Sequence, residues 1–186
     1  MYQDPIRMEF TPNPQTLKFL VYERPLLPRG TANFPNAESA ATSPLPMRLF
    51  AIPGVAKVMV APAFVTVTME EGADPVAVFE GVHMALHAHL ESGEHPVDPA
   101  AVGASDSAEA DSPTAARIRE IIEEEIRPAV AMDGGDITFE RFVDGIVYVN
   151  MRGACSACPS STATLKMGIE ARLREELPEV VEVVQI

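Results

Sequence analysis

Residues 137–161 read ITFERFVDGIVYVNMRGACSACPSS, and this stretch decides the fold of the second half of the chain. The runs Ile137–Val143 and Ile146–Met151 are rich in β-branched and aromatic residues, which favours two strands. Asp144-Gly145 lies between them and is a strong signal for a two-residue hairpin turn. A C-x-x-C motif follows the second strand at once. The stretch therefore predicts an antiparallel hairpin that leads directly into a pair of cysteines.

Helices are expected on both sides of this hairpin. Residues 113–130 carry four isoleucines at helical spacing, and Gly134 is well placed for the left-handed position that often ends a helix. Residues 159–177 predict a second helix, which Pro159 opens, and residues 180–186 predict a last strand. The second half of the chain should therefore have the order α-β-β-α-β.

The first half predicts a separate mixture of helices and strands. Alternating apolar residues favour a strand over residues 16–22. Two β-branched runs, 54–60 and 64–69, are joined by only three residues and therefore predict an antiparallel hairpin. Asp74-Pro75 is typical of an N-cap followed by proline at the first helical position, and we expect that helix to run to about Leu90. Shorter helical turns are expected over residues 36–41 and 46–50.

Between the two halves, residues 92–114 are rich in proline, alanine, serine and acidic residues and contain no aromatic residue. Such a composition offers little to bury and is typical of a flexible linker. The fold class is therefore predicted as α+β, with two small α+β domains joined by a flexible acidic linker. The expected limits are 1–92 for the N-terminal domain, 93–112 for the linker and 113–186 for the C-terminal domain.

Composition narrows the classes of function. The chain has 186 residues, 47% of them hydrophobic, which is enough for two small cores. Its net charge of −13 argues against binding to nucleic acid or to an anionic membrane surface. No apolar run is long enough to span a bilayer, and the first residues resemble neither a secretory signal nor a transit peptide. We therefore expect a cytoplasmic protein that binds neither nucleic acid nor membrane.

The cysteines Cys155 and Cys158 are the only two in the chain. A C-x-x-C pair supplies half of a four-sulfur metal site or a complete redox dithiol. Because Pro159 suits the first helical position, Cys158 is the expected N-cap, where the positive end of the helix dipole favours a thiolate. The small residues around both sulfurs are expected to leave them exposed. Either the pair is a disulfide switch, or a second copy of the chain supplies the missing ligands.

Several motifs together resemble the NifU-like (Nfu-type) iron–sulfur scaffold proteins. In the second half, the resemblance rests on residues 132–136, the hairpin, residues 153–161 and the Leu-Pro-Glu-Val of the final strand. In the first half, it rests on Thr11-Pro12-Asn13-Pro14 and on the segments 17–19, 43–45, 48–50 and 64–68. The resemblance thus covers nearly the whole chain apart from the expected linker.

The resemblance implies a 4Fe–4S cluster that bridges two protomers, with Cys155 and Cys158 of each protomer as ligands. The ligand count agrees, because such a cluster is normally held by four cysteine thiolates and one chain has two. The implied protein is a homodimer and not an enzyme: a carrier that receives a cluster, with assembly factors as further partners, and passes it to apo iron–sulfur proteins.

Other interpretations of the same cysteines remain. A thioredoxin-like dithiol oxidoreductase would use the same pair, although an antiparallel hairpin precedes the motif where that fold has a βαβ unit. A zinc ion shared across a dimer and a purely structural pair are further alternatives.

Two other clusters of polar residues are conceivable sites. His83, His87 and His89 lie close together on the expected helix after Asp74, but no further metal ligand is evident nearby in the sequence, so we expect ordinary surface or partly buried histidines. We interpret residues 133–136 as a helix cap and turn rather than as a catalytic carboxylate pair, and residues 123–125 as a solvated helix face.

Overall fold

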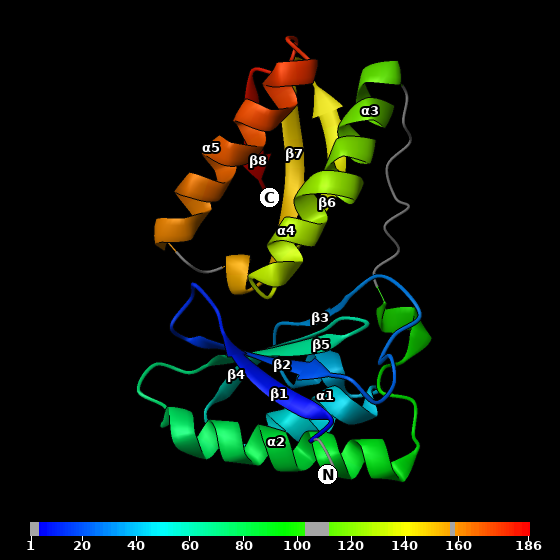
Figure 1. Cartoon of the computed structure of the whole chain (residues 1–186), viewed down its shortest axis with the longest axis vertical. Coiled ribbons are helices and arrows are strands. Elements are labelled where there is room, and N and C mark those ends of the chain that lie inside the picture. The colour runs from blue at the N-terminus through cyan, green and yellow to red at the C-terminus, as the bar shows by residue number, and fades with distance from the viewer. Residues whose placement is uncertain (1–3, 103–111, 157–158) are drawn as a thin grey trace. The chain divides into compact units, whose positions relative to one another are not determined.

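The structure of the chain, a computed structural model, describes residues 4–102, 112–156 and 159–186 (Figure 1). It divides into two compact units, Met1–Gly103 and Ala104–Ile186. Each unit combines helices with a sheet and has a hydrophobic core of its own, so the predicted α+β fold class is confirmed. None of the helices in the described ranges combines the length and hydropathy that crossing a bilayer requires.

The first unit is built on a five-stranded sheet in which all neighbouring strands are antiparallel. The order of strands across the sheet is β1-β2-β5-β4-β3. The strands predicted over residues 16–22, 54–60 and 64–69 are present, whereas β1 and β3 were not predicted. The strands are β1 (Ile6–Phe10), β2 (Thr16–Val21), β3 (Ala32–Phe34), β4 (Val55–Val60) and β5 (Phe64–Met69).

Helices cover one face of this sheet (Figure 1). They are η1 (Glu38–Ala40), α1 (Pro44–Phe50) and α2 (Pro75–Ser92). The predicted N-cap of α2 is present, because an Asp74 side-chain oxygen accepts a hydrogen bond from the Val76 N–H at 3.0 Å. The helix predicted to begin at residue 46 begins at Pro44 instead, since proline is well tolerated in the first turn.

Part of the expected linker packs on the first unit. Val97 is buried in the first core, and residues Pro99–Ala101 form the short helix η2. The Leu45 N–H donates to the carbonyl oxygen of Pro96, and the Asp98 N–H donates to Oγ of Ser43. The prediction that this segment has almost nothing to bury is therefore wrong at Val97, Ala101 and Val102, which pack in or against the first core. Residues 103–111 of the expected linker lie outside the described residues, and its last residue, Ser112, is the N-cap of α3.

The second unit has the predicted order α-β-β-α-β. One long helix comprises α3 (Pro113–Ile121), the π-helical segment η3 (Ile122–Ile126) and α4 (Arg127–Met132). A π-turn in this place is explained by Pro128, which has no N–H to donate and therefore interrupts the regular α-helical hydrogen bonds. The remaining elements are β6 (Gly135–Val143), β7 (Ile146–Gly153), η4 (Ala154–Ser156), α5 (Pro159–Glu176) and β8 (Glu182–Gln185).

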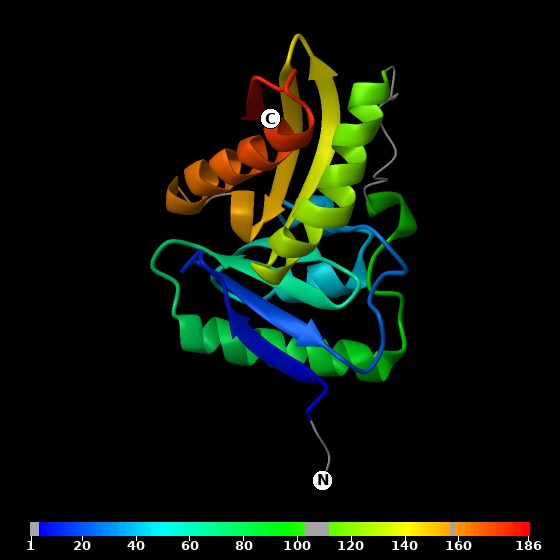
Figure 2. The same ribbon diagram turned by 45° about the horizontal axis from the view of Figure 1, so that its top comes forward.

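The three strands of this unit are ordered β6-β7-β8, with β6 and β7 antiparallel and β7 and β8 parallel. Asp144 and Gly145 both have positive φ, 50° and 82°, which is the geometry of the predicted two-residue hairpin turn. The α3–α4 helix and α5 lie side by side against the β6–β7 hairpin and are joined by ion pairs such as Arg172–Glu125 (Figures 1 and 2). Between them, Ile118, Ile122, Ile137, Val147 and Leu173 form a completely buried core.

Candidate functional site

Cys155 lies in η4, the short turn that connects β7 to α5. β7 ends at Gly153, whose φ of 65° turns the chain sharply. The Ala154 N–H donates to the carbonyl oxygen of Gly134 at 3.1 Å, and Oγ of Ser156 donates to the carbonyl oxygen of Gly153 at 2.9 Å. Local hydrogen bonds thus hold the cysteine-bearing turn against the segment that links α4 to β6.

The side chain of Cys155 packs inward, against Gly135. A Cβ atom added at Gly135 would overlap Sγ of Cys155 and would lie 3.0 Å from its Cβ. Glycine is therefore required at this position if Cys155 is to keep this conformation. Cys155 is only 6% exposed and belongs to the second core. The prediction of an exposed sulfur is wrong for Cys155, because the missing side chain at Gly135 leaves room for Sγ to pack beneath the turn.

Cys158, the second predicted site residue, lies outside the described residues. The same holds for its expected role as the N-cap of α5. The structure therefore describes one of the two candidate ligands, together with the helix α5 that follows the motif.

A buried ion pair lies next to the Cys155 turn. Asp136, on β6, is 2% exposed, and its two carboxylate oxygens accept hydrogen bonds from Nε and Nη2 of Arg127 at 2.7 and 3.2 Å. Glu123 accepts a further hydrogen bond from Arg127 at 2.6 Å. Burial by itself would lower the pKa of Arg127, but the hydrogen bonds and charges of Asp136 and Glu123 raise it overall. The pair fixes the start of β6 against the helix.

The structure shows the roles of the two acidic segments, residues 133–136 and residues 123–125. Gly134 has the predicted left-handed φ, 77°, and residues 133–134 form the expected cap and turn after α4, whereas Gly135 and Asp136 already belong to β6. Residues 123–125 form the expected solvated helix face, since Glu124 and Glu125 are exposed and Glu123 is half-buried, but two of them also form ion pairs. Glu123 pairs with Arg127 in the same helix, and Glu125 pairs with Arg172 of α5, because η3 and α5 lie side by side.

The three histidines of α2 have different environments. Nε2 of His83 lies 2.9 Å from Oδ2 of Asp4, and Nε2 of His87 lies 3.1 Å from Oδ1 of the same carboxylate. No local sequence pattern links Asp4 to these histidines, because it is 79 and 83 residues away from them. Only the packing of the N-terminal segment on α2 brings the three side chains together.

His89 is completely buried, in contrast to the expected surface or partly buried position. Neither of its ring nitrogens has a hydrogen-bond partner among the described residues. Its pKa is lowered, first by burial and then by the nearby positive charges of Arg24 and Arg48. His89 is therefore a neutral core residue, since its position on the helix points it into the first unit.

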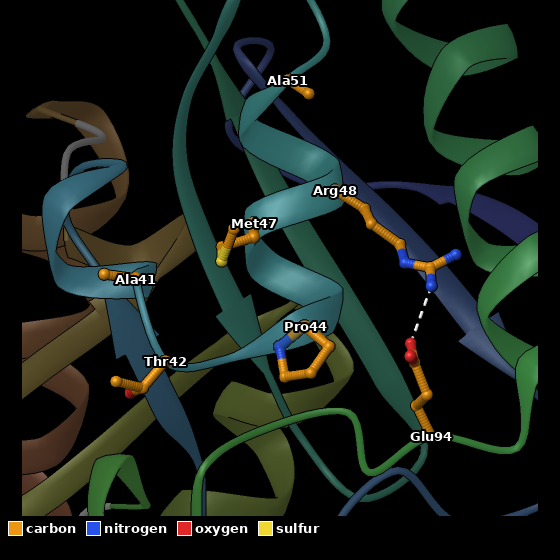
Figure 3. Close-up of a pocket in the computed structure, with 7 residues that line it drawn as sticks. All are labelled: Ala41, Thr42, Pro44, Met47, Arg48, Ala51 and Glu94. Carbon is orange, nitrogen blue, oxygen red and sulfur yellow. Dashed lines mark hydrogen bonds and ion pairs between the residues drawn. The ribbon is translucent and has the colours of Figure 1, made fainter.

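The first unit also carries an open pocket of about 520 Å³ beside α1 (Figure 3). Its lining is mostly apolar and includes Ala41, Pro44 and Met47. Arg48 and Glu94 form an ion pair of 2.7 Å at its edge, so their charges are already matched. The lining has neither a thiol nor an imidazole, and the pocket therefore offers no ligand for the metal chemistry of the cysteine motif.

Each of the two units matches a known protein family. Residues 6–93 match the family described as the N-terminal domain of the scaffold protein Nfu/NifU, and residues 118–184 match the NifU-like domain. The molecule is thus a two-domain protein that joins an Nfu-type N-terminal domain to a NifU-like domain.

Relatives share this organisation over nearly the whole chain. The human NFU1 iron–sulfur cluster scaffold homolog, mitochondrial, is 38% identical over 182 residues, which cover 97% of this chain and 71% of the human protein. NifU-like protein 5, mitochondrial, of Arabidopsis thaliana is 42% identical over 94% of this chain and 65% of its own length. The chain therefore belongs to the Nfu-type family of NifU-like proteins, as its motifs predicted.

Among solved structures, a NifU-like protein from Saccharomyces cerevisiae is similar, with a TM-score of 0.45 and 22% identity. It covers 53% of this chain and 90% of the yeast chain. A likeness at this level adds nothing to the description of the site.

Proposed function

We propose that this protein is an iron–sulfur cluster scaffold and carrier that binds a 4Fe–4S cluster through Cys155 and Cys158 of two protomers. The observation that carries the proposal is the position of Cys155, in a short turn between the end of β7 and the start of α5, inside a C-x-x-C motif. The human relative is itself named an iron–sulfur cluster scaffold homolog, which supports the same role.

The ligand count explains the dimer. Each chain has two cysteines, and a 4Fe–4S cluster is normally held by four thiolates. A homodimer whose twofold axis passes through the cluster would complete the set without any other ligand. Delivery to an apo iron–sulfur protein would then be an exchange of ligands: each acceptor thiolate forms an iron–sulfur bond as a carrier thiolate leaves. No electron is transferred in this step, and no small substrate is converted, so the carrier is not an enzyme.

Binding requires a change at Cys155. Its Sγ packs against Gly135 and belongs to the second core, so the sulfur has to turn outward before it can ligate a shared cluster. The short turn η4 can rearrange for this purpose, because β7 and the described core residues of α5 are anchored by their own packing. We infer that the apoprotein protects this thiol and that cluster loading exposes it to the partner.

The remaining parts of the proposal concern partners and location. The first unit would contact the assembly factors that supply the cluster, since it has none of the proposed ligands. We also propose a cytoplasmic location, although the human and Arabidopsis relatives are named as mitochondrial proteins.

The proposal is tested by anaerobic reconstitution of the full chain with iron and sulfide. We expect about four irons and four sulfides per dimer, because four thiolates suit a 4Fe–4S cluster. Sedimentation should show that loading increases the dimer fraction. Cys155→Ser and Cys158→Ser should each abolish loading, whereas Ser39→Ala, at an exposed position of the first unit, should load normally. Stoichiometric zinc without sulfide after reconstitution, or normal loading by either cysteine variant, contradicts the proposal.

A further inference from the structure

Asp4, His83 and His87 form a compact cluster on the first unit, which we call the Asp4 triad. One oxygen or nitrogen atom from each residue can be chosen so that all three lie within 4.8 Å of one another. Each histidine directs Nε2 at a different oxygen of the same carboxylate, at 2.9 and 3.1 Å. Three potential metal ligands therefore converge on one point, and they come from two distant parts of the chain.

The triad is held by the surrounding structure. His83 and His87 are four residues apart on α2, so their side chains project from the same face of the helix. The His83 ring contacts Phe79, which in turn stacks on the buried Phe19 of β2. Oδ1 of Asp4 also accepts a hydrogen bond from the Ile6 N–H at 2.9 Å, which fixes the carboxylate at the start of β1. Two rings and one carboxylate are thus oriented before any ligand arrives.

The geometry is close to that of a metal site. Ligands bound at 2.0–2.2 Å in a tetrahedral site are separated by about 3.3–3.6 Å. The two observed separations, 2.9 and 3.1 Å to the two oxygens of Asp4, need to open by only about 0.2–0.7 Å for the metal to enter. The side chains are 29–49% exposed, so solvent can reach the point on which they converge. A water molecule would complete the coordination.

We propose that the Asp4 triad is a binding site for a divalent first-row transition metal, separate from the cysteine motif. Two imidazole nitrogens and one carboxylate oxygen suit Zn²⁺ and Fe²⁺, whereas Mg²⁺ and Ca²⁺ prefer oxygen ligands alone. Of the two, Zn²⁺ should bind more tightly, following the general order of affinities. The negative net charge of the chain, −13, favours any cation.

The position of the Asp4 triad indicates how a bound metal would affect the first unit. Asp4 lies two residues before β1, which forms one edge of the sheet, and both histidines lie on α2, which packs on the sheet (Figures 1 and 2). A bound metal would join the edge strand to the helix. Because it binds the folded form, it should raise the stability of the first unit and protect β1 from opening.

The test uses the full chain with Cys155→Ser and Cys158→Ser, which removes the thiols that would otherwise bind zinc. Calorimetric titration with Zn²⁺ should show one site per chain with a micromolar Kd. Asp4→Asn, His83→Gln and His87→Gln should each weaken binding about tenfold or more, since loss of even a second-shell partner has effects of this size. The matched control is His95→Gln, an exposed histidine outside the triad, which should bind like the parent.

A second measurement separates the metal site from a hydrogen-bonded cluster that binds nothing. Hydrogen exchange of the β1 amides should slow on addition of Zn²⁺ in the parent and in His95→Gln, but not in the three triad variants. Anaerobic Fe²⁺ should give the same pattern at higher concentration. Equal zinc affinity in all variants, Mg²⁺ binding as tight as that of Zn²⁺, or the absence of one-to-one zinc binding by the parent would each overturn the proposal.

Discussion

The close packing of Cys155 on Gly135 predicts the effect of a Gly135→Ala substitution. The new methyl group would overlap Sγ of Cys155 and would lie 3.0 Å from its Cβ and 3.1 Å from a methyl carbon of Val130. Overpacking of this kind costs about 1–3 kcal/mol, because the neighbours have to leave their preferred conformations. The Cys155 side chain is the neighbour that can move, since it stands on a short turn. We therefore expect the variant to destabilise the second unit by about 1–3 kcal/mol and to expose the thiol.

Two measurements on the full chain check this expectation. Urea unfolding gives the loss of stability, and hydrogen exchange of the β6 and β7 amides assigns it to the second unit. Mass spectrometry of the alkylated peptide gives the rate at which Cys155 reacts, which should rise in the variant. Gly168→Ala on α5 is the matched control: a Cβ there meets nothing within 4 Å, so it should be stabilising by about 0.5–1 kcal/mol. Unchanged stability and alkylation in Gly135→Ala would refute the assigned role of Gly135.

Three further predictions follow from the buried groups. Arg127→Met should destabilise the second unit by about 3 kcal/mol or more, because it leaves the Asp136 carboxylate buried without its cation. Arg172→Gln removes a residue of an exposed ion-pair network and should cause a much smaller change, with both variants measured by urea unfolding. His89 has a lowered pKa because of burial, so the unfolded chain binds more protons in mild acid. The free energy of unfolding should therefore keep its full contribution from neutral His89 above about pH 6.5 and fall as the pH drops below that value. The decrease with falling pH, measured by urea unfolding, should be smaller in His89→Leu. Finally, residues 1–102 should form a more stable fragment than residues 1–93 in thermal unfolding, because only the longer one keeps Val97 in the core; equal midpoints would contradict the packing of this segment.

Local sequence patterns were sufficient wherever neighbouring residues determine the conformation. The Asp144-Gly145 turn, the Asp74-Pro75 helix start and the left-handed Gly134 were all predicted, because each depends on the φ or the hydrogen bonds of a few adjacent residues. The sequence patterns do not predict β3 and β1, for two different reasons. β3 has only three residues, too few for an alternating pattern to be recognised, and β1 is a short edge strand whose pairing with β2 defines it.

The sequence by itself determined the α+β class, the order of elements in the second unit, the family and the identity of both candidate cysteines. These depend on composition, spacing and local turns, which the linear chain contains in full. Only the tertiary structure decided that Cys155 packs inward on Gly135, that Arg127 neutralises Asp136 and that Asp4 meets His83 and His87. Each of these contacts depends on the three-dimensional packing of separate elements, and no local pattern in the sequence encodes which side chains will meet.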